Sequence, residues 1–154
     1  EVNFPPKLFA AAFKAAHDAG YGCVAHAGEI CGPQSIWEAL EYLPISRIGH
    51  GVRSIEDPKL IEELKKRNIT LEVCPTSNIS LAIYPNYESH PLRQLYEAGV
   101  KVTLNSDDPY FFDTSIGHEY KIAQERMGMT EEDLNNITRI AIENSFADNE
   151  IKPY

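Results

Sequence analysis

Short, mostly apolar runs alternate along the chain with longer amphipathic stretches. The short runs are bounded by glycine, proline or polar residues and predict buried strands at residues 23–25, 47–49, 69–73 and 100–104. The longer stretches repeat apolar side chains at helical spacing and predict helices at residues 6–19, 34–42, 57–67 and 91–99, with two further helices closing the chain. The pattern therefore predicts one helix followed by four strand-helix units.

Local signals mark the ends of several helices. Two prolines open the first helix and Gly20 ends it, and its apolar residues are predicted to share one inward face: Leu8, Phe9, Ala12, Phe13 and Ala16. Asp57 precedes a proline and is a strong N-cap. Thr130 and Asp133 have the spacing of a capping box. Residues 74–90 lack a helical pattern and are predicted to form a turn and a loop.

Strands that alternate with helices in this way predict a parallel sheet in an α/β fold. Four such units make up half of a (β/α)8 barrel, which usually needs about 250 residues. The chain has 154 residues. A half-barrel would leave two unpaired sheet edges, which proteins usually pair or cover.

Composition narrows the classes of function. The net charge of −9 argues against partners such as nucleic acids or anionic membranes, which favour basic surfaces. No apolar run is long enough to span a bilayer. Three cysteines without a CxxC spacing argue against a disulfide framework, so we expect a cytoplasmic protein. Because the first residue is Glu1 rather than Met, the expectation of no targeting segment covers only the printed residues.

Residues with chemical potential follow each predicted strand. His26 and Glu29 provide an imidazole and a carboxyl group, and His50 is a second imidazole between two glycines. The other two segments are Cys-Pro-Thr-Ser-Asn at residues 74–78 and the adjacent carboxyl groups of Asp107 and Asp108. The carboxyl ends of parallel strands meet at one edge of the sheet, where (β/α) barrels build their active sites. Imidazoles and carboxylates are zinc donors, so the pattern indicates a hydrolytic metal centre.

Each segment by itself also has a structural explanation. His26 with Glu29 could be a surface ion pair. His50 could lie in a tight turn, and Ser77 with Asn78 could be turn residues. Cys74 could be a buried thiol. One aspartate of the Asp107–Asp108 pair can cap a helix, but a second carboxylate at a buried strand end would need a cation or a donor. The other histidines are interpreted as structural: His17, His90 and His118.

Four motifs occur together in this chain, His-Ala-Gly-Glu at 26–29, Arg-Ile-Gly-His-Gly at 47–51, Cys-Pro-Thr-Ser-Asn at 74–78 and Ser-Asp-Asp-Pro at 106–109. The combination resembles the adenosine deaminase family, and the resemblance extends over almost the whole chain. It implies an enzyme of purine metabolism with a zinc-dependent (β/α)8 barrel. Such an enzyme hydrolyses the 6-amino group of an adenine nucleoside or base and releases ammonia.

The resemblance also implies roles for individual residues. His26 and Asp107 would be zinc ligands. Glu29 would protonate N1 of the purine ring, and His50 would orient the attacking water and help to deprotonate it. Asp108 would form a hydrogen bond with N7 of the purine.

The chain departs from the family in what it lacks. The family's His-x-His zinc ligands on the first strand, and a purine-contacting glycine after the fourth strand, do not occur in it. The resemblance therefore implies that residues 1–154 form a single domain, the C-terminal half-barrel from helix 4 through strand 8 and the closing helices. Two protein ligands would hold zinc poorly, so we expect the N-terminal half to come from another chain or from residues outside this sequence.

Three functions follow from the resemblance. The first prediction is that the parent protein deaminates adenosine to inosine and ammonia. The alternative within the same class is free adenine, because residues 106–109 resemble the form seen in adenine deaminases. In both cases Ser77 would support the pair formed by Asp107 and His50. The third is a non-catalytic half-barrel that folds or self-associates through its sheet edges.

Overall fold

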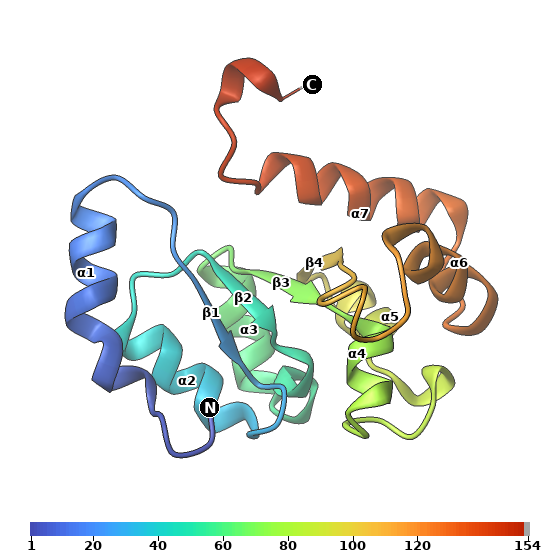
Figure 1. Cartoon of the computed structure of the whole chain (residues 1–154), viewed down its shortest axis with the longest axis horizontal. Coiled ribbons are helices and arrows are strands. Elements are labelled where there is room, and N and C mark those ends of the chain that lie inside the picture. Colours follow the sequence, from blue (N-terminus) through green and yellow to red (C-terminus); the bar gives the residue numbers. More distant parts are fainter. Residues whose placement is uncertain (153–154) are drawn as a thin grey trace.

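A computed structural model describes residues 1–152 of the chain. Its centre is a parallel sheet whose four strands lie side by side in chain order (Figure 1): β1 (Val24–Ala27), β2 (Arg47–His50), β3 (Thr70–Val73) and β4 (Lys101–Leu104). Ala27 pairs with His50, and Val73 pairs with Leu104, so the carboxyl ends of the strands are aligned. The α/β fold and the strand order agree with the prediction of four consecutive units of a (β/α)8 barrel.

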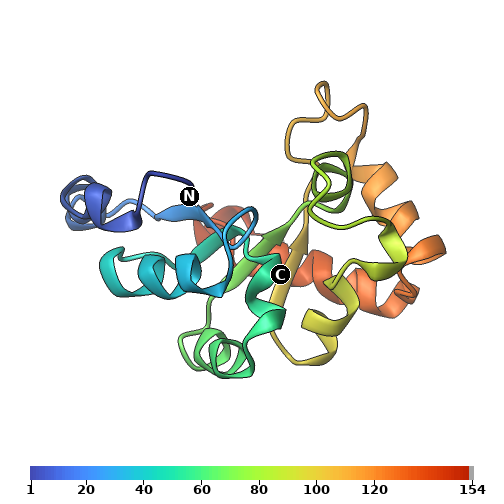
Figure 2. The same ribbon diagram turned by 90° about the horizontal axis from the view of Figure 1, so that it is seen from below.

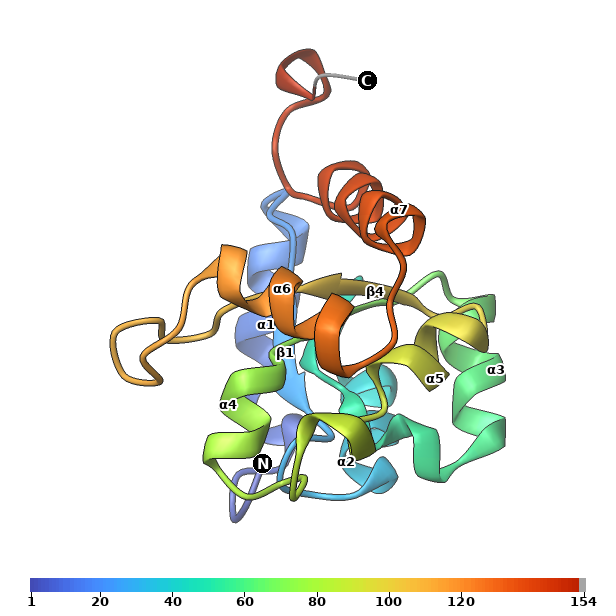
Figure 3. The ribbon, with the colours of Figure 1, turned by 90° about the vertical axis from the view of Figure 1, so that its right-hand side faces the viewer.

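Seven α-helices surround the sheet in the described residues: α1 (Ala10–Asp18), α2 (Pro33–Tyr42), α3 (Pro58–Lys66), α4 (Pro75–Ser80), α5 (Leu92–Glu97), α6 (Ile116–Arg126) and α7 (Glu131–Glu143). Four short 3₁₀ helices connect them: η1 (Pro6–Phe9), η2 (Val52–Glu56), η3 (Tyr87–Ser89) and η4 (Asn149–Ile151). Figures 1 and 3 show α5 and α7 on opposite sides of β4, and both contact it. Among residues 1–152, none of the helices combines the length and the apolar character needed to cross a membrane.

The two faces of the sheet differ in chemistry because side chains alternate along a strand. Ile48, Leu71 and Val102 are paired across three strands and are fully buried. They belong to a core that includes Leu60 of α3 and Leu95 of α5. The alternate positions are paired in the same way and form a polar row on the other face: His26, Gly49, Glu72 and Thr103. The core thus holds the strands rigidly while the polar row faces the candidate site.

The first helix differs from the prediction. It begins as the 3₁₀ helix η1, and neither η1 nor α1 contains a buried residue. Leu8 is 66% exposed and Phe9 is 43% exposed, so the predicted inward face is wrong for these side chains. The apolar spacing was suited to a buried helix, but β1 is an edge strand within the described residues and offers little surface to cover these side chains.

The segment after β3 also differs from the prediction. Residues expected to form a turn make the short helix α4, whose residues 75–78 are buried. No side chain caps this helix at Cys74, so the usual sequence signal for a helix start is missing. The predicted caps elsewhere are confirmed. The Asp57 side chain accepts a hydrogen bond from the Lys59 backbone at 2.9 Å, and Thr130 with Asp133 forms a capping box.

Candidate metal and catalytic site

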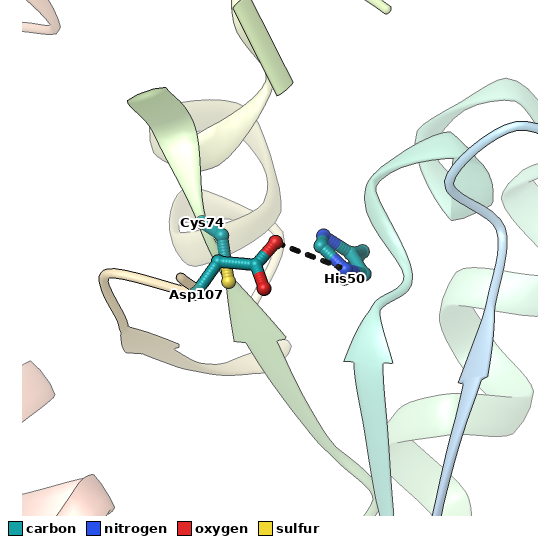
Figure 4. A group of neighbouring side chains, drawn as sticks. All are labelled: His50, Cys74 and Asp107. Atoms are coloured by element: carbon teal, nitrogen blue, oxygen red, sulfur yellow. Dashed lines mark ion pairs between the residues drawn. The ribbon is translucent and has the colours of Figure 1, made fainter. Parts of the chain in front are cut away.

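The candidate residues gather at the carboxyl edge of the sheet. A cavity of about 460 Å³ is lined there by His26, His50, Cys74 and Asp107, together with the inner strand residue Glu72. Figure 4 shows the Asp107 carboxylate directed toward the His50 ring, with the Cys74 sulfur beside it. Residues from all four strand ends therefore line one cavity, as the sequence pattern predicted, whereas Glu29 and Asp108 are not among the residues that line it.

His50 lies at the centre of the site. Its Nε2 is 3.8 Å from Asp107 Oδ2, and its Nδ1 is 3.6 Å from Glu29 Oε1. The ring centroids of His26 and His50 are 5.2 Å apart. Burial is the main reason that the pKa of His50 is lowered, and the neighbouring His26 lowers it further while Asp107 opposes both. The ring is therefore mainly neutral near pH 7.

The backbone is unusual at both central residues. His50 has φ = 63° and Asp107 has φ = 56°, in the left-handed region that residues other than glycine rarely adopt. Such conformations cost of order 1 kcal/mol or more and persist only where the surrounding structure enforces them. Strain at two facing side chains is typical of a functional site.

The glycines on either side of His50 serve different purposes. A Cβ atom at Gly49 would lie 2.8 Å from Cδ2 of His26, so the missing side chain lets the His26 ring lie against β2. Gly51 has φ = 65°, and a Cβ atom there would lie 2.6 Å from Cδ2 of Leu71. Gly51 therefore permits both the reversal of the chain after His50 and its close packing on the core.

Glu29 is a carboxyl group held partly away from water. Burial raises its pKa from 4.5 to about 7, and the negative charges of Glu1 and Asp107 add to the rise. Its Oε1 is buried without a hydrogen-bond partner among the described residues. The Glu1 carboxylate accepts hydrogen bonds from the backbone N–H groups of Glu29, Ile30 and Cys31, at 2.7–3.0 Å, and fixes this loop. A carboxyl group in this setting can hold a proton near neutral pH.

Buried polar side chains of α4 form hydrogen bonds with residues of the site. Ser77 Oγ donates a hydrogen bond to Asp107 Oδ2 at 2.7 Å, in agreement with the supporting position that we expected for Ser77. The side-chain amide of Asn78 contacts both His50 and His90. Asn78 belongs to the candidate segment of residues 74–78, whereas His90 is a histidine that we interpreted as structural. Their contacts with each other and with His50 are evident only in the folded chain.

Several side chains of the site are of the kinds that bind zinc in proteins. His50, Cys74 and Asp107 each present a donor atom, and these atoms lie within 4.8 Å of one another. Burial and the nearby carboxylates raise the pKa of Cys74, and its thiol lies 3.5 Å from the Glu72 carbonyl, so the thiol is a neutral buried group. His26 lies outside this group of three but lines the same cavity. Imidazole and carboxylate donors at one cavity fit Zn²⁺.

Asp107 and Asp108 are not the buried pair that we expected, since both are exposed in the described chain. β4 is an edge strand, and the loop from Asn105 to Ser115 extends away from the sheet (Figures 2 and 3). Tyr110 in this loop is fully exposed. The argument from repulsion between two buried carboxylates therefore does not apply to this part of the barrel, because water can reach both groups.

Comparison with known proteins is consistent with this geometry. Residues 1–153 match the family model described as adenosine deaminase. The chain belongs to the adenosine deaminase family. It is 51% identical over 140 residues to an adenine deaminase of Agrobacterium fabrum, covering 91% of this chain and 43% of that protein. It is 50% identical over 144 residues to an adenine deaminase of Rhizobium leguminosarum, covering 94% and 45% respectively. The chain thus spans less than half the length of these relatives.

Two solved structures show the same fold as this chain. The adenine deaminase from Arthrobacter aurescens superimposes with a TM-score of 0.94 at 32% identity, over 99% of this chain and 46% of that one. An amidohydrolase from Burkholderia ambifaria with bound Zn superimposes with a TM-score of 0.89 at 29% identity, over 99% and 43%. The four strand-helix units of this deaminase-family chain are therefore a partial (β/α)8 barrel.

Proposed function

We propose that the protein to which this chain belongs is a zinc-dependent adenine deaminase, which converts adenine and water to hypoxanthine and ammonia. The observation that carries the proposal is the contact of Glu29, His50 and Asp107 at one strand edge, with the pKa of Glu29 near neutrality. Our first prediction from sequence was the nucleoside adenosine. The names of the similar curated proteins favour the alternative, the free base.

The residues of this chain divide the chemistry between them. Glu29, which is partly protonated at pH 7, donates its proton to N1 of the purine and makes C6 electrophilic. Water adds to C6 and gives one proton to the amino group, the C–N bond breaks and ammonia leaves, and the second proton of the water returns to Glu29. Asp108 is exposed beside the cavity and would hold the purine by a hydrogen bond to N7. His50 would orient the attacking water from within the cavity.

His26 and Asp107 would hold the zinc ion. Zinc, when bound, lowers the pKa of water enough to provide hydroxide near neutral pH. Ser77 fixes the Asp107 carboxylate through the 2.7 Å hydrogen bond to Oδ2. A catalytic zinc site generally needs three or more protein ligands, so the remaining donors would come from the other half of the barrel. That half would pair with the open edges of β1 and β4.

Substrate assays on the protein extended to the length of its relatives test the proposal. With zinc supplied, we expect loss of adenine and formation of hypoxanthine and ammonia, with a larger kcat/KM for adenine than for adenosine. Glu29→Gln should lower kcat by about 10²–10⁴-fold, since it removes a general acid, and should leave the zinc content unchanged. Faster turnover of adenosine would favour our first prediction, and no turnover of either purine would refute the proposed activity.

Measurement of the bound zinc distinguishes the proposed enzyme from a non-catalytic half-barrel. The 154-residue chain would supply two zinc ligands, His26 and Asp107, so stoichiometric zinc in the extended protein and weak zinc binding by the chain alone would support the proposal. An extended protein that holds no zinc would favour the non-catalytic alternative. We also propose a cytoplasmic location, supported by the three cysteines, which are all free thiols in residues 1–152.

A further inference from the structure

Three buried polar side chains link the candidate site to α5. His50 is 2% exposed, Asn78 is fully buried and His90 is 4% exposed. His50 Nδ1 lies 3.3 Å from Asn78 Nδ2, and His90 Nε2 lies 3.1 Å from Asn78 Oδ1. The backbone nitrogen of Leu92, at the start of α5, lies 3.2 Å from His90 Nδ1. These contacts form one continuous chain of hydrogen bonds across the core.

The direction of every hydrogen bond in this chain follows from its last member. A backbone N–H can only donate, so His90 Nδ1 accepts from Leu92 and the proton of the neutral ring is on Nε2. His90 Nε2 therefore donates to the Asn78 carbonyl oxygen. This fixes the orientation of the Asn78 amide, whose nitrogen can only donate to His50 Nδ1. The remaining proton of His50 is then on Nε2.

The surroundings of His90 hold the chain of hydrogen bonds in this arrangement. Burial lowers the pKa of His90 to about 3, so the ring is neutral at physiological pH. The Tyr84 ring packs edge-on against it with centroids 5.1 Å apart. Because a buried polar group without a partner is costly, reversing any one hydrogen bond would leave a second group unpaired. The directions of these hydrogen bonds therefore depend on one another, and none of them reverses alone.

We propose that Asn78 and His90 are positioning residues, which hold His50 in the tautomer with its proton on Nε2. That proton points to the cavity, where His50 Nε2 lies 3.8 Å from Asp107 Oδ2. In this form His50 holds an oxygen atom in the site by donating a hydrogen bond to it and has no free lone pair there to remove a proton. This consequence rests on the proposed function. It changes the role that the sequence implied for His50, which was to help deprotonate the water.

Nitrogen-15 NMR of the 154-residue chain tests the tautomer without any assay of activity. At pH 7 with a chelator present, long-range ¹H–¹⁵N correlations should show both His50 and His90 with the proton on Nε2. A proton on Nδ1 of His50, or an even mixture of tautomers, would overturn the proposal. The wild-type spectrum alone decides this point, so the test does not depend on whether a variant folds.

Asn78→Asp provides a matched reversal. At a pH where the ¹³C shift of the new carboxyl group shows it to be ionised, it still accepts the hydrogen bond from His90 Nε2 but cannot donate to His50, so we expect the His50 proton to move to Nδ1 while His90 is unchanged. Ser80→Ala, at an exposed position of the same helix, should leave both tautomers unchanged. Retention of the Nε2 proton on His50 in Asn78→Asp would show that Asn78 does not set the tautomer.

Kinetics of the extended, zinc-loaded protein test the consequence for catalysis. Asn78→Asp should lower kcat for adenine by about 10–100-fold with little change in KM, since partners that orient site residues typically contribute this much. A change of tautomer with an unchanged kcat would refute the positioning role. If the wild-type extended protein has no deaminase activity, the proposed function fails while the NMR result on the tautomer still stands.

Discussion

Glu29 should make the stability of this chain depend on pH in a direction opposite to that of most carboxyl groups. Its pKa rises from 4.5 to about 7 on folding, mainly because burial disfavours the charged form. The unfolded chain therefore loses this proton at a lower pH than the folded chain does. The contribution of Glu29 to stability is fully present below pH 4.5 and is lost as the pH rises through about 7.

The size of the effect follows from the shift. One pKa unit corresponds to about 1.36 kcal/mol, so the upper limit is about 3 kcal/mol. The side chain of Glu29 is 13% exposed, and this contact with water reduces the penalty, so we expect about 1–2 kcal/mol. Glu29→Gln removes the titration while keeping the shape of the side chain. The variant should therefore match the wild type at pH 4.5 and exceed its stability by about 1–2 kcal/mol at pH 8.

Urea unfolding followed by circular dichroism measures this difference. The experiment uses the 154-residue chain at several pH values between 4.5 and 8, with a chelator to keep metal from the carboxylates. Glu125→Gln, at an exposed position of α6, controls for the change in net charge. A Glu29→Gln effect that does not vary with pH, or a variant less stable than the wild type at pH 8, would show that the pKa of Glu29 is not raised.

Three further changes test the packing around the site by urea unfolding. Gly51→Ala should lower the free energy of unfolding by about 2–4 kcal/mol, because it combines a left-handed backbone with overlap on Leu71. Gly20→Ala, with φ = 85° and open space around it, should lower it by only about 1–2 kcal/mol. Equal losses in the two variants would show that the overlap on Leu71 does not contribute. Glu119→Ala should cost about 2–4 kcal/mol, because this fully buried carboxylate accepts a hydrogen bond from the first turn of α4 at 3.1 Å, and Glu119→Gln should restore part of the loss. Thr130→Ala should lower the free energy of unfolding by about 1 kcal/mol by removing the capping box, and a loss below about 0.3 kcal/mol would contradict that role.

Much of the site was predictable because its residues are next to strand ends. Glu29 and Asp107 each lie a few residues after a strand and His50 is the last residue of β2, and parallel strands place such residues at one edge of the sheet. The contacts of Asn78 and His90 were not predictable in the same way, although Asn78 belongs to the candidate segment of residues 74–78. His50 is 28 positions from Asn78, and Asn78 is 12 positions from His90, so their contacts depend on how α4 and the segment before α5 pack in the folded chain.

Two of the errors in the sequence-based predictions have a common cause. Leu8 and Phe9 have the spacing of a buried face, and Asp107 with Asp108 follows a buried strand, but all four residues are exposed. Hydrophobic pattern reports which side chains favour burial, and it does not report which surface is available to cover them. Both misjudged segments flank β1 or β4, the strands at the two edges of the sheet.

By itself, the sequence determined the order of the strands and helices, the caps at Asp57 and Thr130, and the candidate chemistry at each strand end. These features depend on interactions between residues close together in the chain, so local pattern is enough to predict them. Only the tertiary structure decided that Glu29 is shielded from water, that Gly49 leaves room for His26, and that Leu92 sets the proton position of His50 through two other side chains. Those properties depend on burial and on contacts between distant segments, which exist only after the chain has packed.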